Sequence, residues 1–173
     1  MPTMIRAACS VFTGFAVAAC AAKPVADANP LEGAWRIVDA VATGADSSTN
    51  HNPQPSMLIF AKGYYSWIAV TTNTARVLFK AATPTDAERL DAYNSFVANS
   101  GTYQIADSTL TIRPVAARMP NFMAGGSEIY HFRTAGDTLW MHERSTDGRY
   151  RFGAELAPLP GVTETRYVLV RMH

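Results

Sequence analysis

The sequence predicts an all-β domain, a sandwich or a barrel of short antiparallel strands, with an export segment before it and one inserted helix. Three observations support this prediction. Short apolar stretches recur along the chain with turn signals between them. Only one stretch has apolar residues at helical spacing. The chain has 173 residues, 48% of them hydrophobic and 17% charged, which suits one globular domain with a sizeable core.

Residues 1–20 have the organisation of a signal peptide. Arg6 supplies the positive charge, and the apolar run 7–19 is too short to cross a bilayer as a helix. The four residues VAAC that end at Cys20 resemble the bacterial lipobox, in which the cysteine is acylated and becomes the new N-terminus. The alternative is ordinary cleavage at a small-residue site such as Ala22, which would release an unanchored exported protein.

The two cysteines of the chain, Cys9 and Cys20, both fall in this segment, so the mature domain is expected to have no disulfide and no cysteine metal site. Residues 21–30 are predicted to be a tether and residues 31–173 the folded domain. Ala21 resembles the residue after the cysteine in lipoproteins sent to an outer membrane. We therefore expect the domain to be lipid-anchored on the periplasmic side of that membrane.

The strand predictions follow the turn signals. Hairpins are expected around Lys62-Gly63, Asp107-Ser108 and Gly136-Asp137, since each pair separates two apolar stretches. The expected strand regions are 34–43, 56–72, 76–81, 101–115, 127–145, 149–156 and 165–173. The polar tract 44–56 between the first two is predicted to be a loop.

One helix is predicted after residue 85. Thr85 and Glu88 fit a capping box, in which each side chain binds the backbone N–H of the other residue. The apolar stripe of this helix is Leu90, Tyr93 and Val97, with Phe96 beside it. Asn99 and Gly101 are the candidate end signals. The helix is expected either to pack against the outside of the strands or to cover a barrel mouth.

Several short motifs, in this order, resemble the bacterial lipocalin-like domain family over about residues 31–171. They are Gly33-x-Trp35 in the first strand, Gly101-x-Tyr103, the segment from Pro120-Asn121 to Gly125, Phe132 followed by Gly136-Asp137-Thr138-Leu139, and the closing YVLVR with Arg171. The resemblance implies an antiparallel lipocalin-like barrel of about eight strands with an internal cavity. It does not imply one particular activity.

The same resemblance gives Gly33, Trp35 and Arg171 a structural role. In lipocalins a last-strand arginine lies over the first-strand tryptophan, and an arginine guanidinium stacks well on an indole face. Arg166 is the competing partner for Trp35. A glycine early in the strand permits close backbone approach.

Aromatic side chains are the candidate ligand contacts. Tyr65 and Trp67 are two residues apart and share a strand face. The full candidate set is Tyr65, Trp67, Tyr103, Phe122, Tyr130, Phe132 and Trp140, with Trp140 expected on the face opposite Tyr130 and Phe132. Such rings suit a small hydrophobic or amphipathic ligand. The alternative is that they only fill the core.

His131 and His142 are the strongest candidates for chemistry. A two-residue turn at Gly136-Asp137 places them opposite each other, where they could exchange a proton or bind a metal. A polar pair on the outer wall is the favoured alternative. Asp39 is in phase with Trp35 and could face inward as a base, or lie in water at the strand end. The same two alternatives, an inward-facing or a solvent-facing carboxylate, apply to Glu128 and Glu143.

No cofactor or metal site is predicted, because the sequence has no phosphate loop, nucleophile elbow or zinc-ligand spacing. The net charge of +1 without a basic stripe does not suggest nucleic acid as a partner. The first functional hypothesis is binding of a small hydrophobic molecule. The second is an acid–base isomerase, cyclase or hydratase, and the third is an envelope interaction protein with a filled barrel.

Overall fold

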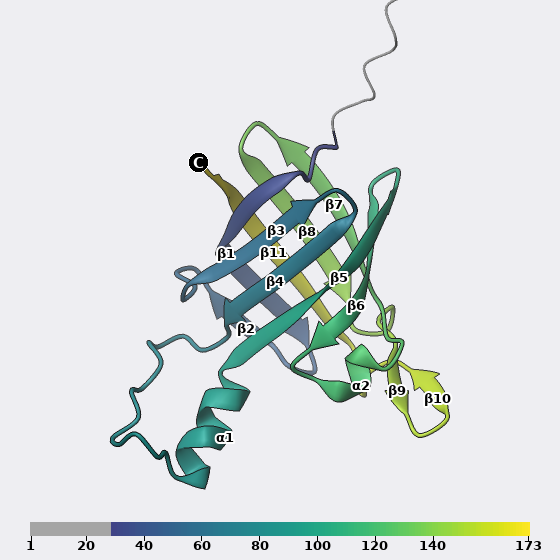
Figure 1. Cartoon of the computed structure of the whole chain (residues 1–173). Helices are drawn as coiled ribbons and strands as arrows, with labels where there is room; N and C mark the ends of the chain where they lie inside the picture. Colours follow the sequence, from purple (N-terminus) through teal and green to yellow (C-terminus); the bar gives the residue numbers. More distant parts are fainter. Residues whose placement is uncertain (1–28) are drawn as a thin grey trace, which may run out of the picture.

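The computed structural model describes residues 29–173, which form a closed barrel of eight antiparallel strands (Figure 1). The predicted all-β barrel is therefore confirmed. The predicted signal peptide, Cys20 and residues 21–28 of the predicted tether lie outside the described residues. Among residues 29–173, no helix is both long enough and apolar enough to cross a membrane.

The barrel strands follow one another in space nearly as they do in the chain. They are β1 (Gly33–Gly44), β3 (Ser56–Ala61), β4 (Tyr64–Val70), β5 (Phe96–Ala106), β6 (Thr109–Ala117), β7 (Glu128–Ala135), β8 (Thr138–Arg144) and β11 (Thr163–Met172). Each pairs with the next, and β11 pairs with β1 to close the barrel. The remaining elements are β2 (Ser48–Asn50), which pairs with β1, the separate hairpin β9 (Tyr150–Phe152) and β10 (Glu155–Ala157), α1 (Asp86–Asn94) and α2 (Pro120–Met123).

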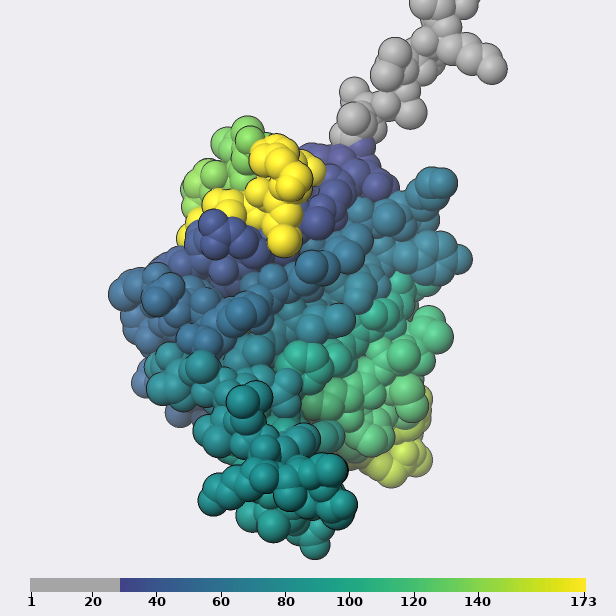
Figure 2. Space-filling view, turned by 60° about the vertical axis from the view of Figure 1, so that its left-hand side comes forward, coloured from purple at the N-terminus to yellow at the C-terminus, as the bar shows by residue number. Residues whose placement is uncertain are grey.

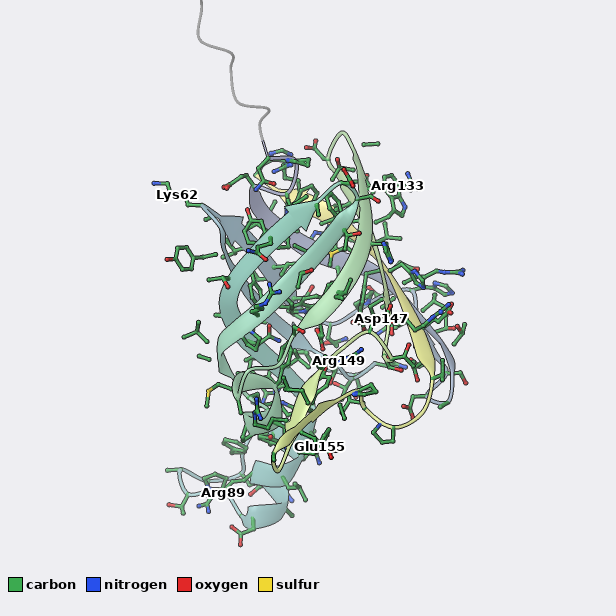
Figure 3. The ribbon with its side chains drawn as sticks, turned by 90° about the vertical axis from the view of Figure 1, so that its right-hand side faces the viewer. Lys62, Arg89, Arg133, Asp147, Arg149 and Glu155 are labelled. Carbon is green, nitrogen blue, oxygen red and sulfur yellow. The ribbon has the colours of Figure 1, made fainter. Side chains whose placement is uncertain are left out.

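The two ends of the barrel have different connections. At one end, which we call the closed end, the three predicted hairpins turn in two residues each, at 62–63, 107–108 and 136–137. At the opposite end, which we call the mouth, the connections are long and carry β2, both helices and the β9–β10 hairpin. Figure 3 shows this separation, with Lys62 near the closed end and Arg89 beyond the mouth.

The closed end is filled by apolar side chains around Trp35, which is completely buried. The Trp35 indole N–H donates to the backbone oxygen of Leu31 at 2.8 Å. The Arg171 guanidinium carbon lies 4.2 Å from the centre of the Trp35 ring, so the predicted stacking is observed. Arg166 is not its partner, because it lies opposite Val41 further along β11.

Gly33 is required by this arrangement. Its φ angle is +122°, a conformation that residues with a side chain rarely adopt. A Cβ atom there would lie 2.6 Å from a terminal nitrogen of Arg171. The same Arg171 side chain donates to the backbone oxygen of Glu32 at 2.5 Å. Gly33 therefore makes room for the guanidinium that covers Trp35.

Two local predictions are wrong. The stretch 76–81 forms no strand, and Val77 and Leu78 are largely exposed. The helix ends at Asn94 rather than at Asn99 or Gly101, because β5 begins at Phe96 and takes Val97 into the barrel. The predicted capping box is present.

The helix α1 makes little contact with the barrel. None of its residues is buried, and it projects beyond the mouth together with the preceding loop (Figure 2). Tyr93 is its main link, since its hydroxyl donates to the backbone oxygen of Arg118 at 3.1 Å. The Arg118 guanidinium also lies over the Tyr93 ring at 4.4 Å. The helix thus neither packs along the outer wall nor closes the mouth in this structure.

Candidate functional site

The mouth half of the barrel holds a cavity of about 410 Å³. Its walls come from the mouth-side halves of β1, β4, β5, β7, β8 and β11, and its rim comes from the polar tract after β1. On the rim lie Asp46, Ser48, Asn50, Pro53 and Gln54. The predicted loop 44–56 therefore folds over the mouth, with β2 paired to β1 at Ala40–Ala42.

Three aromatic side chains form one wall of the cavity. Trp67 on β4, Tyr130 on β7 and Tyr167 on β11 all line it. The Trp67 ring centre lies 5.6 Å from that of Tyr130 and 5.5 Å from that of Tyr167, the second pair meeting edge to face. We call these three residues the aromatic wall. Their rings come from three different strands and contact one another inside the barrel.

Two glutamates lie beside the aromatic wall. Glu128 begins β7, and Glu143 lies directly opposite Tyr130 in the β7–β8 hairpin. Inward-facing residues alternate along a strand, so Glu128 and Tyr130 share the inner face with Glu143. Both carboxylates line the cavity.

Tyrosine hydroxyls bind both carboxylates. Tyr130 donates to one oxygen of Glu128 at 2.5 Å, and Tyr150 of β9 donates to the other. Tyr167 donates to Glu143 at 3.1 Å. The β9–β10 hairpin is therefore not part of the barrel, but it contributes one residue to the cluster.

Burial inside the barrel changes the acidity of both glutamates. It raises the pKa of Glu143 to about 7, and the neighbouring charge of Glu128 adds to this effect. Burial also raises the pKa of Glu128, against hydrogen bonds from Tyr130 and Tyr150 that lower it. Repulsion between two close carboxylates favours a state in which the pair holds a proton near neutral pH.

Two buried polar atoms near this cluster have no hydrogen-bond partner among the described residues. They are the Tyr65 hydroxyl and the Asn99 side-chain oxygen. Tyr65 is only 3% exposed, and burial followed by the charge of Glu128 raises the pKa of its hydroxyl. Asn99 lines the cavity. Such atoms are uncommon in folded proteins and mark positions where a further group can bind.

The described residues include no group of three or more His, Cys, Asp and Glu side chains that could hold a metal ion. The titratable side chains that line the cavity are acidic or phenolic. They are Asp46, Glu128, Glu143, Tyr130 and Tyr167.

The candidate aromatic residues occupy several different places. Trp67 and Tyr130 line the cavity, and Tyr65 lies behind it, with burial and Glu128 affecting its hydroxyl. Tyr103 packs edge to face on Phe60 at the closed end, with ring centres 5.0 Å apart. Tyr103 is thus part of the filled core.

The other three candidates do not line the main cavity either. Phe122 of α2 packs on Tyr150, with ring centres 5.1 Å apart. Phe132 is half-buried against the core. Trp140 lies on the outer wall, as expected, where the Arg133 guanidinium is 3.5 Å from the ring centre.

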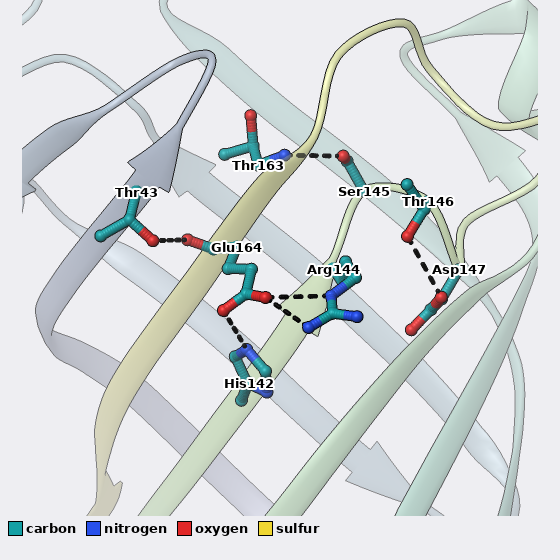
Figure 4. Close-up of polar contacts among 8 residues, drawn as sticks. All are labelled: Thr43, His142, Arg144, Ser145, Thr146, Asp147, Thr163 and Glu164. Carbon is teal, nitrogen blue, oxygen red and sulfur yellow. Dashed lines mark hydrogen bonds and ion pairs between the residues drawn. The ribbon is translucent and has the colours of Figure 1, made fainter.

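The histidine pair has the predicted register, with His131 opposite His142. Both lie on the outer face of the hairpin, because the neighbouring Met141 faces the core. His142 Nε2 is 3.6 Å from Glu164, which also accepts from Arg144 (Figure 4). A second, more open hollow of about 460 Å³ lies beside the pair. The histidines therefore do not meet the cavity carboxylates.

Asp39 faces away from Trp35 and the core. The β1–β11 register shifts between Ile37 and Asp39, a bulge that reverses the alternation of side chains along β1. The Asp39 carboxylate instead contacts His51 at 2.5 Å on the outside. Of the two alternatives for Asp39, inward as a base or in contact with water, the structure shows the second, because the bulge moves Asp39 off the inner face that Trp35 occupies.

Sequence reasoning treated Glu128 and Glu143 as ambiguous and did not single out Tyr150 or Tyr167. The signal for the glutamates was present in the turn at Gly136-Asp137. The register that pairs the histidines on the outside also puts Glu128 and Glu143 on the inner, apolar face. No local signal points to Tyr150, because its position depends on the long connection after β8.

No family model matches this chain, and no curated protein matches it either. The geometry of the cavity therefore carries the functional argument.

Proposed function

We propose that this protein binds a small amphipathic molecule in the mouth cavity of its barrel. The observation that carries the proposal is a cavity of about 410 Å³ with an aromatic wall on one side and polar side chains around it. Small-molecule sites combine apolar walls with a few polar groups in this way. A barrel filled throughout, as in the interaction-protein hypothesis, would leave no such space.

The lipocalin-like family is part of this proposal. The motif residues Gly33, Trp35 and Arg171 meet at the closed end, and the eight-stranded barrel has its cavity at the other end. This arrangement supports the resemblance that the motifs suggest.

We also propose that the chain is exported and lipid-anchored through Cys20. The described chain begins at the closed end, where the Asn29 side chain donates to the Tyr103 hydroxyl and Arg171 contacts the backbone oxygen of Pro30. An anchor ahead of these residues would attach at the end opposite the mouth. The cavity would then open away from the membrane.

The binding proposal is tested by expressing the full chain with Cys20→Ser in an exporting host. The purified protein is compared by native and denaturing mass spectrometry. We expect a non-covalent adduct that disappears on denaturation and gives the mass of the ligand.

A matched pair of variants locates the adduct. Ala42 lines the cavity, so Ala42→Phe should fill it and remove the adduct. Val41 is the residue before Ala42 and faces the outside of the barrel, so Val41→Phe should keep the adduct. An adduct that survives Ala42→Phe, or an apo mass in every preparation together with no binding of added apolar probes, would contradict the proposal.

A second candidate function is acid–base catalysis on a small organic substrate. The observation that favours it is Glu143, whose pKa of about 7 suits proton transfer at neutral pH on the wall of the cavity. Glu143 would remove a proton from carbon next to a carbonyl, and Tyr130 would stabilise the enolate by turning its O–H from Glu128 to the enolate oxygen. His131, His142 and Asp39 have no place in this mechanism, because they lie outside the cavity.

The catalytic candidate is tested by exchange in D₂O. Small ketones are incubated with the protein, and NMR follows deuterium incorporation at the α-carbon. Exchange faster than in buffer, lost in Glu143→Gln and kept in the exposed control Glu155→Gln, would support catalysis. If every ketone exchanges at the rate measured in buffer alone, the catalytic candidate is rejected and the proposal of binding without turnover remains.

A further inference from the structure

We propose that the ligand of this cavity is a small organic cation, an amine with an apolar body, whose ammonium group binds between Glu128 and Glu143 against the aromatic wall. This inference rests on the proposed binding function and specifies the chemical class of the ligand.

The charge of the cavity lining favours a cationic ligand. Its lining contains three carboxyl groups, those of Asp46, Glu128 and Glu143, and no lysine, arginine or histidine. A buried carboxylate without a cation is costly, and two neighbouring ones are more so. An anionic ligand would add to this repulsion, whereas an ammonium ion would relieve it.

The aromatic wall also favours a cationic ligand. Trp67 has two further rings within 5.6 Å, those of Tyr130 and Tyr167, next to both carboxylates. The electron-rich face of an aromatic ring stabilises a cation, most strongly where water is excluded. Carboxylates and rings together form the kind of site that recognises alkylammonium groups.

Two buried oxygen atoms near the glutamates have unused hydrogen-bonding capacity. The Asn99 side-chain oxygen and the Tyr65 hydroxyl are buried without partners in the described chain. Tyr65 shares the inner face of β4 with Trp67, and burial followed by the charge of Glu128 raises the pKa of its hydroxyl. An ammonium group carries up to three N–H donors and no acceptor, so it fits a site rich in oxygen acceptors.

Binding of an ammonium ion between the two glutamates should release a proton. The groups that face the two glutamates are Tyr130 from β7, Tyr167 and Thr165 from β11, Tyr150 from β9 and Tyr65 from β4. None is cationic, so in the free protein the pair is stabilised by a bound proton. The ammonium ion replaces that proton, which is released to the buffer. Affinity should therefore rise with pH through the neutral range, as Glu143 ionises.

The experiment compares three probes of nearly equal shape by isothermal titration calorimetry with the Cys20→Ser chain. They are 2-phenylethylamine, which stays cationic to about pH 9, neutral 2-phenylethanol and anionic 3-phenylpropionate. At pH 8 we expect the amine to bind at least about tenfold more tightly than the alcohol, and the acid most weakly. Between pH 8 and pH 6 the preference for the amine should shrink by about tenfold, while alcohol binding stays constant.

Variants connect the preference to the site. Glu143→Gln should abolish the preference for the amine and keep alcohol binding, whereas the exposed control Glu155→Gln should change neither. Tyr167→Phe, which keeps the ring, should retain most of the preference.

The outcomes separate the two proposals. Equal binding of amine and alcohol, or tighter binding of the acid, would overturn the cation inference and leave the binding function standing. Failure of all three probes, together with an apo native mass, would overturn the binding function itself. A preference for the amine that persists in Glu143→Gln would also contradict the inference.

Discussion

The closed end and the mouth of the barrel are built from the same eight strands, but their interiors have different chemistry. At the closed end the inward-facing residues are apolar and completely buried, as at Trp35, Leu139 and Leu169. On the inner face of the same strands, Glu143 lies four residues from Leu139 on β8, and Tyr167 lies two residues from Leu169 on β11. The pleat of the strand is continuous, so the change comes from the side chains alone.

This difference indicates that the closed end stabilises the fold, whereas the mouth contains groups that reduce its stability. Burial of apolar area stabilises the closed end, roughly 25 cal/mol per Å². The mouth half keeps two glutamates with raised pKa beside the cavity, together with two buried polar atoms that have no partner among the described residues. The proposed ligand site would account for this arrangement, since Glu128, Glu143 and Asn99 all line the cavity in which the ligand would lie.

The largest expected effect is at the closed end. Trp35→Ala should lower the free energy of unfolding by about 3–5 kcal/mol, because it leaves a cavity and removes the partner of Arg171. Urea unfolding followed by circular dichroism measures it. The control Trp140→Ala, on the outer wall, should cost about 1 kcal/mol or less. Equal costs at the two sites would mean that the closed end is not the stabilising core.

A substitution of Glu143 in the mouth should have the opposite effect and raise the free energy of unfolding. The folded-state pKa of Glu143 is raised from 4.5 to about 7, so its contribution to stability is best below pH 4.5 and is lost as pH rises to 7. That loss is about 3 kcal/mol. Glu143→Gln does not titrate and should be more stable than the parent at pH 8 by about this amount, with little difference near pH 4.5.

Urea unfolding between pH 4.5 and pH 8.5 measures this effect. Glu155→Gln, on the exposed β9–β10 hairpin, should leave the pH profile unchanged. If the Glu143→Gln protein is less stable than the parent at pH 8, Glu143 stabilises the folded mouth at that pH, which contradicts the prediction.

A smaller effect is expected at Gly33. Gly33→Ala should cost about 2 kcal/mol, since the residue has φ +122° and the new Cβ would displace Arg171 from Trp35. Gly63→Ala is the matched control, with φ +83° and nothing within 4 Å of the new Cβ. It should cost about 1 kcal/mol. Thermal unfolding compares them, and equal shifts would argue against the Arg171 contact.

The closed end could be predicted from the sequence in most respects. Each of its three hairpins has a two-residue turn flanked by apolar strands, and these local signals fix the register of the pairs. The stacking of Arg171 on Trp35 followed from the family resemblance. The bulge after Ile37 and the register shift between Ser100 and Gly101 were hidden. In β1 the reason is that Ala40, Val41 and Ala42 are all apolar, so the reversed alternation cannot be seen in the sequence.

The mouth was predicted far less well, for a physical reason. Its residues come from long connections whose course depends on tertiary contacts rather than on local turns. Tyr150 reaches Glu128 from the connection after β8, and Asn50 reaches the cavity from the tract after β1. Glu143 is different: the sequence analysis leaves it open, although the register of the predicted hairpin already implies that it faces inward.

The smallest expected effect tests whether the α1 projection is independent of the barrel. Thr85 caps α1 by accepting from the Glu88 backbone N–H, and the Glu88 carboxylate accepts from the Thr85 N–H at 2.8 Å. Loss of an N-cap side chain costs a helix about 1 kcal/mol, so Thr85→Ala should speed amide exchange in residues 86–94 about fivefold. Because no α1 residue is buried, the urea midpoint of the barrel should not move. Hydrogen–deuterium exchange with mass spectrometry measures both regions in one sample, with the closed-end strands as the internal control. A lowered barrel midpoint would instead mean that α1 contributes to the stability of the mouth, and the contrast between the two ends would then be smaller than the burial pattern indicates.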